Sequence, residues 1–454
     1  MPLTNVQIRP GLNKSDTPSG AEGQWIDSDF VRFRYGQPEK IGGFQAIGQH
    51  TISGPARAQH CWNDLEGRKY AALGTSKALY IYYEDAFYDI TPLATAITGA
   101  TFTSTNGSST VTVNKASHNL IAGEYITFTS VTVPGATTTL NGDITDSATT
   151  ITLTDASSFS SSGSVRIEDE IITYSGKSSN DLTGCTRGTN GTTAVAHANT
   201  TAVRESTVTR YNTTDFTTLT FEVLTVATNS FTITMAISET GTGMSSAGGA
   251  SINPYEEIGP TIQTYGYGWG TDTWGSDEWG EGSTSTQVVL DPGSWSLDNF
   301  GQQLIATIKD GKTFVWDAGA ANPLEQRATV MTGAPTATRL TIVSDRDRHV
   351  VHFGTETTIG DNTTQDPMFI RFSDQENYNV YAPTSVNTAG TFRLDTGNKI
   401  VAAVSGKDYN LILTDTAAYV MQFVGPPFTF SIRQVGSNCG CIGQHAVVYA
   451  DGQV

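Results

Sequence analysis

The side chains that could take part in acid–base or metal chemistry are scattered along this chain. Of its seven histidines, His349 and His352 lie three residues apart in one expected strand. Successive side chains of a strand alternate between its two faces, so these imidazoles point to opposite sides and cannot share a metal ion. We therefore expect structural roles for both.

Carboxylates are the second candidate chemistry, because a glycosidase needs two of them flanking its substrate. The acidic clusters fall in expected turns, where a catalytic pair cannot be told from solvated residues. The stretch 361–366 is rich in Asp and Asn but lacks the Gly and terminal Glu of a calcium-binding loop, so we expect a turn there. The clusters are Asp277-Glu278, Asp345-Arg346-Asp347 and Asp374-Gln375-Glu376.

Neither the cysteines nor the glycines form a recognised site. Cys439-Gly-Cys441 lacks the spacer and second pair of a zinc site, and a buried apolar role is the expectation for all four cysteines. No phosphate-binding loop or dinucleotide-binding fingerprint is present. The sequence therefore predicts no catalytic residue, no metal site and no cofactor, and hence a protein that is not an enzyme.

One aromatic segment stands out. Its three tryptophans are five residues apart and each is followed by Gly, a spacing that fits neither a helix nor a strand. We expect an extended loop with aromatic anchors, and the simpler interpretation is a long loop pinned to its own domain by its three rings. The alternative is an interaction loop that binds sugars or another protein, because Trp and Tyr dominate binding hot spots. The candidate residues are Tyr265, Tyr267, Trp269, Trp274 and Trp279.

The elements that must position these residues are β-strands. Charged residues are only 15%, Gly numbers 46, and no apolar pattern of helical period exceeds two turns. The net charge of −18 argues against wrapping nucleic acid, and its simplest role is solubility. The alternative is an acidic channel wall, which would let DNA pass without binding it. No apolar stretch approaches 18 residues and no signal peptide is evident, so we expect no membrane segment.

Composition divides the chain into three regions, 1–93, 94–252 and 253–454. The middle region is rich in Thr, Ser, Ala and Gly, lacks Trp, and repeats short alternating strands at 8–12-residue spacing, which predicts small β-sandwich or barrel modules. The modules are expected to be nested, with 120–128 and 221–226 as neighbouring strands and an inner module at about 141–205.

The flanking regions share a different pattern: a strand, an Asp/Gly turn, an aromatic strand and a third strand, at irregular spacing of about 40–60 residues. This predicts an all-β fold with a β-propeller-like domain interrupted by the inserted modules, and a Greek-key sandwich is the competing fold. The pattern also ends the chain. A strand at 445–450 precedes Asp451-Gly452, a hairpin turn signal without a returning strand, so we expect an incomplete blade and a truncated chain.

The first and third regions resemble the tail nozzle or tail tubular proteins of short-tailed bacteriophages. The stretch 181–191 of the middle region is similar to small β-modules inserted in phage structural proteins. The words that carry the nozzle resemblance are Val6-Gln-Ile-Arg-Pro-Gly-Leu-Asn-Lys14, Asp29-Phe-Val-Arg-Phe-Arg34, Pro38-Glu-Lys-Ile-Gly-Gly43, Tyr267-Gly-Trp-Gly-Thr-Asp-Thr-Trp-Gly275, Asp366-Pro-Met-Phe-Ile-Arg-Phe-Ser-Asp-Gln375 and Met421-Gln-Phe-Val-Gly-Pro-Pro-Phe-Thr-Phe430.

This resemblance implies a non-enzymatic virion protein made in the host cytoplasm. It would form a homo-oligomer, a ring of six copies around the DNA-ejection channel, with the tail adaptor or tubular protein and tail fibres as partners. DNA would pass through the lumen without sequence-specific binding. The alternative is a glycan-binding or depolymerising tail protein that recognises the host surface, with the tryptophans as a sugar platform.

Overall fold

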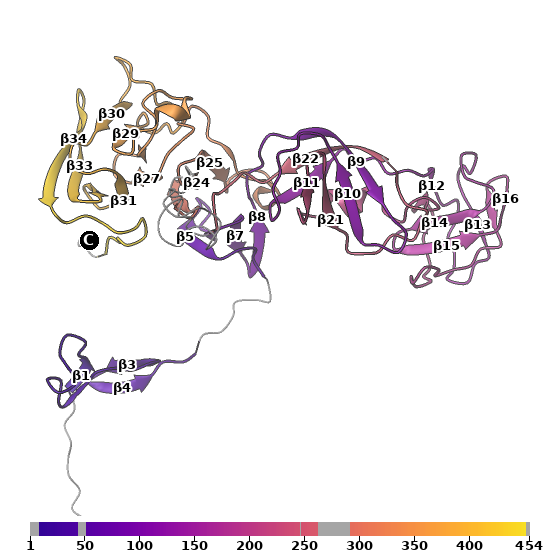
Figure 1. Cartoon of the computed structure of the whole chain (residues 1–454), viewed down its shortest axis with the longest axis horizontal. Coiled ribbons are helices and arrows are strands. Elements are labelled where there is room, and N and C mark those ends of the chain that lie inside the picture. Colours follow the sequence, from indigo (N-terminus) through magenta and orange to yellow (C-terminus); the bar gives the residue numbers. More distant parts are fainter. Residues whose placement is uncertain (1–8, 44–50, 246, 262–290, 451–454) are drawn as a thin grey trace, which may run out of the picture. The chain divides into compact units, whose positions relative to one another are not determined.

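The computed structural model describes residues 9–43, 51–245, 247–261 and 291–450, and it is nearly all-β (Figure 1). The described helical elements are the five-residue α1 (Thr213–Thr217) and the short 3-10 turns η1 (Pro323–Glu325) and η2 (Asn362–Thr364). Contacts divide the chain into two compact units, residues 1–51 with 84–86, and residues 52–83 with 87–454. The predicted all-β class is confirmed.

The N-terminal unit is built from two small sheets. The strands β1 (Arg9–Leu12) and β2 (Gln24–Trp25) pair in parallel, and β3 (Val31–Arg34) and β4 (Gln37–Lys40) form a hairpin. Tyr35 and Gly36 both have positive φ at the hairpin turn, as a two-residue turn of this kind requires. Most side chains of these strands are exposed or only partly buried.

Four four-stranded antiparallel sheets, which we call the blade-like sheets, follow each other in the larger unit. In each sheet the strands are hydrogen-bonded in sequence order, which is the order of a propeller blade. They are β5 (Ala56–Asn63), β6 (Lys69–Thr75), β7 (Leu79–Tyr83) and β8 (Ala86–Asp89); β23 (Trp295–Phe300), β24 (Gln303–Ile308), β25 (Thr313–Asp317) and β26 (Thr329–Val330); β27 (Leu340–Ser344), β28 (His349–Phe353), β29 (Phe369–Phe372) and β30 (Gly390–Arg393); and β31 (Ile400–Ser405), β32 (Asn410–Thr414), β33 (Ala417–Gly425) and β34 (Thr429–Ser437).

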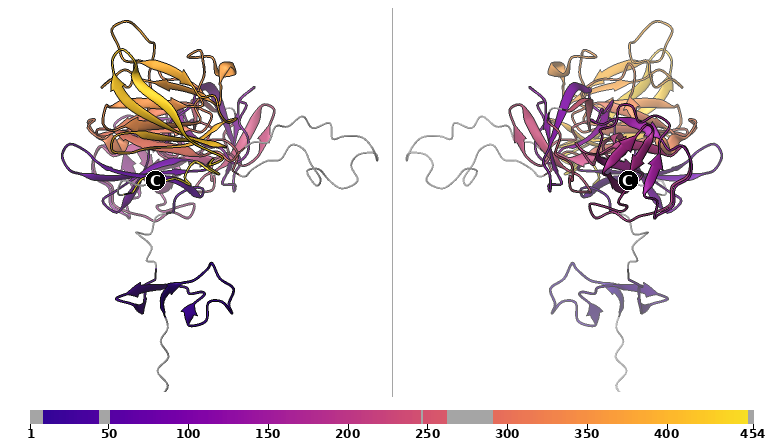
Figure 2. Two further views of the ribbon diagram at one scale, coloured as in Figure 1. Left: turned by 90° about the vertical axis from the view of Figure 1, so that its left-hand side faces the viewer. Right: turned by 90° about the vertical axis from the view of Figure 1, so that its right-hand side faces the viewer.

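The first strands of these sheets lie next to each other, because β23 contacts both β5 and β27, and β27 contacts β31. Apolar clusters fill the spaces between successive sheets. Trp295 is fully buried between the first two, donates its indole N–H to the Thr75 carbonyl at 2.9 Å, and lies so close to Gly74 that a Cβ there would be 2.5 Å from the ring. The long strands β33 and β34 (yellow in Figure 2) form the outer half of the fourth sheet.

The insertion between β8 and β23 contains two layers of nesting. Its outer part is one curved seven-stranded sheet in the order β19-β11-β22-β9-β10-β21-β20, which packs with α1 around an apolar core. Strand β11 pairs with β19, so the predicted neighbourhood of 120–128 and 221–226 is confirmed. The strands are β9 (Ile97–Ser104), β10 (Thr110–Asn114), β11 (Tyr125–Thr129), β19 (Phe221–Glu222), β20 (Val226–Ala227), β21 (Ser230–Thr234) and β22 (Ala247–Pro254).

The inner part, which we call the inner module, is a four-stranded sheet and a three-stranded sheet around a separate apolar core. It leaves the outer sheet after β11 and returns before β19. Its strands are β12 (Thr137–Thr139), β13 (Thr150–Thr152), β14 (Gly163–Ile167), β15 (Glu170–Tyr174), β16 (Gly176–Ser178), β17 (Asp181–Thr183) and β18 (Ala202–Glu205).

The strand predicted at 445–450 is wrong. Only Ala450 makes a bridge there, and Asp451-Gly452 lies outside the described residues. The segment instead runs beside the first strands of the blade-like sheets. The Gln444 amide approaches the Trp295 carbonyl at 3.5 Å, and the rings of Tyr449 and Tyr409 meet edge to face with centroids 6.4 Å apart.

Candidate functional site at the base of the tryptophan segment

All five candidate residues of the predicted interaction loop fall within 262–290, which we call the tryptophan segment. It lies outside the described residues, but the chain on each side of it is described. Residues 258–261 lead into the segment and 291–293 lead out. The Gly293 N–H donates to the Pro260 carbonyl at 2.9 Å, so the segment begins and ends at adjacent points.

Arg57 of β5 clamps this base. Its guanidinium donates to the carbonyl oxygens of both Thr261 and Gly293, which the planar fork of arginine can reach together. Gly293 makes the close approach possible, because a Cβ there would lie 2.0 Å from the Ile258 carbonyl oxygen. The tryptophan segment is thus held by its two ends on the first blade-like sheet.

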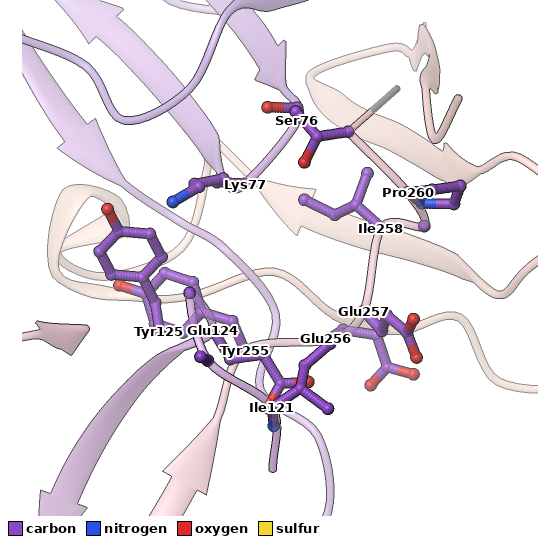
Figure 3. A pocket seen from close by; sticks show the side chains of 14 residues that line it. Ser76, Lys77, Ile121, Glu124, Tyr125, Tyr255, Glu256, Glu257, Ile258 and Pro260 are labelled. Carbon is purple, nitrogen blue, oxygen red and sulfur yellow. The ribbon is translucent and has the colours of Figure 1, made fainter. Parts of the chain in front are cut away.

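A pocket of about 490 Å³ lies beside the base (Figure 3). The turn between β6 and β7 forms one part of it, and residues 121–125 of the insertion and 255–261 form the rest. In Figure 3, Lys77 and Tyr125 lie together on one side and Glu256 and Glu257 on another. Lys77 Nζ is 5.0 Å from the centre of the Tyr125 ring and 3.3 Å from a Glu222 oxygen.

The carboxylates on the acidic side of this pocket have only a few cationic or hydrogen-bonding partners. Glu256 pairs with Lys312 at 2.5 Å, and the Ile121 N–H donates to Glu124 at 2.8 Å. Burial raises the pKa of Glu124, and the neighbouring Glu257 adds to that rise. Acidic side chains alone do not define a ligand, so we assign this pocket the role of seating the insertion against the first sheet.

Tyr255 strengthens the same junction. Its hydroxyl donates to Asp89 of β8, and the Arg327 guanidinium lies 4.9 Å above its ring. Burial is the main cause that raises the pKa of Tyr255 well above its ordinary value, so the hydroxyl stays a donor. Arg327 also pairs with Asp89 at 3.2 Å. These contacts tie the exit of β22 to the blade-like sheets.

A second cavity, of about 290 Å³, is lined by the first strands of all four blade-like sheets and by 444–447; we call it the axial cavity. Asp298 accepts a 2.7 Å hydrogen bond from the Val343 N–H and lies 3.9 Å from His60 Nε2. Burial raises the pKa of Asp298 to about 6, against the opposite effect of His60. His60 also bonds Asn299 at 2.8 Å, which ties the first sheet to the second.

The acidic clusters are not all solvated turn residues, as the sequence suggested. Asp345 lines the axial cavity, where burial raises its pKa, and Asp347 is buried and bonds His349 Nδ1 at 2.7 Å. Local hydrogen bonding causes the difference, since Asp347 also accepts a hydrogen bond from the Ser344 hydroxyl at 2.5 Å, whereas Arg346 between the two aspartates is exposed. Glu376 is exposed and pairs with Arg348 at 2.6 Å. Asp277-Glu278 lies outside the described residues.

The expected structural roles of the two strand histidines are confirmed. His349 packs against Phe372, Phe423 and Phe430, between the third and fourth sheets. His352 points the other way and bonds the Tyr381 hydroxyl at 3.0 Å. The stretch 361–366 contains the short turn η2 with Asp361 capping Thr363, as expected.

The expectation of buried cysteines holds for Cys185 alone. Cys61 and Cys439 are exposed and Cys441 is partly exposed, because they lie at sheet edges and in the segment after β34. Within the described ranges, no group of three or more His, Cys, Asp or Glu side chains is arranged to hold a metal ion. The same ranges contain no helix long and apolar enough to cross a bilayer.

Comparison with known proteins gives little guidance. No family model matches the chain, and no curated protein matches it. Among solved structures, a phage phi92 endosialidase aligns over 89% of this chain with 11% identity and a TM-score of 0.24. The chain spans about half (53%) of the length of that protein. A likeness this distant carries no argument about fold or activity.

Sequence reasoning missed Arg57, Tyr255 and the pair His60–Asp298. Arg57 lies about two hundred residues before the carbonyls it clamps, and His60 is similarly far from Asp298. No local pattern signals such pairs. The paired Gly259 and Gly293 on either side of the tryptophan segment are the one sequence signal that marks its base.

Proposed function

We propose that this chain is a non-enzymatic structural subunit of a phage tail, of the nozzle or tubular type, that forms a ring and contacts a neighbouring protein through the tryptophan segment. The clamp by Arg57 carries the proposal. A segment that presents three tryptophans to a partner gains affinity if its ends are fixed beforehand, because less ordering is needed on binding. The resemblance of short sequence stretches to those of tail nozzle proteins supports the same role.

Cryo-electron microscopy and native mass spectrometry of the purified protein test the ring. We expect a closed homo-oligomer, six copies by the resemblance, with the tryptophan segment at a subunit contact. Changing Trp269, Trp274 and Trp279 to Ala should shift the protein toward monomer. A protein that stays monomeric at high concentration and in the virion would contradict the proposal.

The clamp gives a matched pair of variants. Arg57→Ala removes both bonds to the base, whereas Arg57→Lys keeps the charge but lacks the planar fork. Both should weaken the oligomer, Ala more than Lys, because the segment loses its fixed ends. Arg346→Ala is the control, since this half-exposed arginine pairs with the exposed Asp408 and with no other carboxylate in the described part of the chain.

The alternative, a glycan-binding or depolymerising tail protein, predicts a different outcome of the same tryptophan variants. A glycan array that shows specific binding lost in Trp274→Ala, with the oligomer unchanged, would favour the alternative. Turnover of a polysaccharide by the purified protein would overturn the non-enzymatic assignment.

A further inference from the structure

A pocket of about 550 Å³ lies on the other side of the base of the tryptophan segment, where the chain enters β23, β27 and β31. A smaller cavity of about 110 Å³ shares four of its residues and extends it inward. We call the two together the basic pocket. The side chains that matter here are Lys309, Arg339, Lys399, Asp291 and Asp310.

Three cations converge on the basic pocket from three sheets. Lys309 follows β24, Arg339 precedes β27 and Lys399 precedes β31. The side chains of Lys309 and Arg339 are only 19% and 16% exposed, so they are built into the wall. The whole chain has 26 Lys and Arg against 44 Asp and Glu, so such a cluster is not a general property of its surface.

The two aspartates of this pocket pair with two of its three cations. Lys309 bonds Asp291 at 2.9 Å, and Arg339 reaches Asp310 at 3.4 Å and Asp291 at 3.8 Å. Among the described residues, Lys399 has no ion-pair partner. The hydrogen bond from Lys309 is the main cause that lowers the pKa of Asp291, and the charge of Lys399 acts in the same direction.

The remaining carboxylate near the pocket, Asp415, forms no ion pair with Lys399. Asp415 lines the smaller cavity, but its oxygens accept hydrogen bonds at 2.8 and 2.9 Å from the backbone and side chain of Asn398. These bonds are the main causes that lower the pKa of Asp415, whereas burial acts in the opposite direction. The Asp415 carboxylate therefore binds Asn398 rather than Lys399.

Arg339 is held in place before any ligand arrives. Its aliphatic stem packs over Gly354, where a Cβ would lie 2.5 Å from Arg339 Cδ. Gly354 has φ +60°, which also favours glycine. A guanidinium fixed by its stem loses little freedom on binding an oxyanion, which makes the site more favourable for a small ligand.

We propose that the basic pocket binds a hydroxylated carboxylic acid, such as a uronic acid unit of an acidic polysaccharide. The ligand carboxylate lies between Lys399 and Arg339, and its neighbouring hydroxyls donate to Asp291 and Asp310. The two aspartates decide against DNA, because they repel a chain that carries a charge every ~1.7 Å. A pocket of this size fits one or two sugar units. The site goes beyond the proposed tail role and does not depend on ring formation.

Saturation-transfer NMR titrations with glucuronate test the site in the full chain. Glucose, inorganic phosphate and a short DNA duplex are titrated in the same way for comparison. We expect saturable binding of glucuronate that weakens with salt, and no binding of glucose. Lys399→Gln should weaken glucuronate binding roughly tenfold, the effect of one charge-assisted hydrogen bond. Lys399 is exposed, so this variant should fold normally.

Lys407→Gln is the matched control, because this exposed lysine follows β31 whereas Lys399 precedes it. It should bind glucuronate as the parent protein does. Equal losses in both variants would overturn the proposal, and so would glucuronate binding no tighter than glucose. Phosphate or DNA that binds more tightly than glucuronate, with the same dependence on Lys399, would also overturn it and indicate an oxyanion site of another kind.

Discussion

The inner module and the blade-like sheets are both made of short antiparallel strands, but different interactions hold them together. In the inner module the strands are three to five residues long and much of the chain is loop. A fully buried carboxylate, Glu170, organises those loops. It accepts hydrogen bonds from Arg187 at 2.7 and 2.8 Å, from the N–H groups of Gly188 and Val195, and it lies 2.8 Å from His197 Nε2.

The blade-like sheets instead gain stability from apolar side chains stacked between neighbouring sheets. Between the third and fourth sheets, Phe372 and Phe430 meet edge to face with centroids 4.9 Å apart, beside His349. The buried polar pair Asp347–His349 lies within this aromatic layer and holds a turn rather than a set of loops. The comparison teaches that a loop-rich module with a small apolar core of its own can fix its loops through a central buried charge.

Glu170→Gln should break the inner module and leave the blade-like sheets intact. The change leaves Arg187, whose side chain is 6% exposed, as a buried charge without its partner. Breaking a buried ion pair in this way costs about 3–5 kcal/mol of unfolding free energy. We expect faster hydrogen exchange of 187–197, measured by mass spectrometry, with unchanged exchange in β23–β34.

Glu168→Gln is the control for this variant. Glu168 faces the other ring nitrogen of His197 at 2.8 Å, but its side chain is 64% exposed. Its loss should cost about 1 kcal/mol or less, as for other exposed pairs. If both variants have equal effects, or if exchange rises equally in the blade-like sheets, the contrast between the two regions is wrong.

Phe372→Ala tests the other side of the comparison. Phe372 is 5% exposed, and its replacement should leave a cavity between the third and fourth sheets that costs about 3–4 kcal/mol. Tryptophan fluorescence follows the first two blade-like sheets through Trp62, Trp295 and Trp316, and it does not report on the insertion, because no tryptophan lies within 94–252. We expect a lower denaturation midpoint by fluorescence and unchanged hydrogen exchange at 187–197. A matching loss in the inner module would show that the two regions unfold together.

The two regions also differ in what the sequence could predict. The pattern of a strand, an Asp/Gly turn and an aromatic strand matches pairs such as β24–β25 and β32–β33, in which a turn separates two apolar runs. The same pattern does not mark the first strands β23, β27 and β31. Their residues include Ser296, Asp298 and Thr341, which line the axial cavity or bond the next sheet, so no plain alternation marks them. The surroundings that make these polar residues fit come from other sheets.

The candidate site was predicted even less completely. The tryptophan segment was found from its spacing, but the clamp by Arg57 and the convergence of Lys309, Arg339 and Lys399 depend on contacts between segments far apart in the chain. A sequence pattern records neighbours along the chain, whereas these sites arise from neighbours in space.

Lowering the pH should destabilise the inner module more than the blade-like sheets, without any substitution. Burial opposes ionisation of Glu170, but the hydrogen bonds from Arg187, His197 and the backbone outweigh it and lower its pKa from 4.5 to about 2. Because the folded pKa is depressed, the stabilisation is complete above about pH 4.5 and is lost as the pH falls toward 2. The full loss is at most about 3 kcal/mol.

Pepsin, which is active in this range, measures that loss. Cleavage within 170–197 should rise relative to cleavage in β23–β34 as the pH falls from 4.5 to 2. Glu168→Gln should keep this dependence and Glu170→Gln should lose it. In the blade-like sheets, burial lowers the pKa of His352 to about 3 and raises that of Asp298 to about 6, so acid acts on them in opposite directions. A parallel rise in both regions would show that Glu170 is not the group responsible.

The smallest effect should come from the largest change, the removal of 98–251. The two ends of the insertion are already paired, since Ile97 lies opposite Ile252 and the Ala94 N–H donates to the Pro254 carbonyl at 2.8 Å. An Asn-Gly turn can therefore close the gap, with both isoleucines changed to Thr because the core they pack on is gone. Outside the insertion, the described residues lose few contacts, namely Lys77–Glu222 and those of Tyr255 with Tyr125 and Thr220. The unfolding free energy of the blade-like sheets, measured by fluorescence, should therefore fall by about 1 kcal/mol. An insoluble chain would mean that the insertion, although it has its own cores, is required for the blade-like sheets to fold.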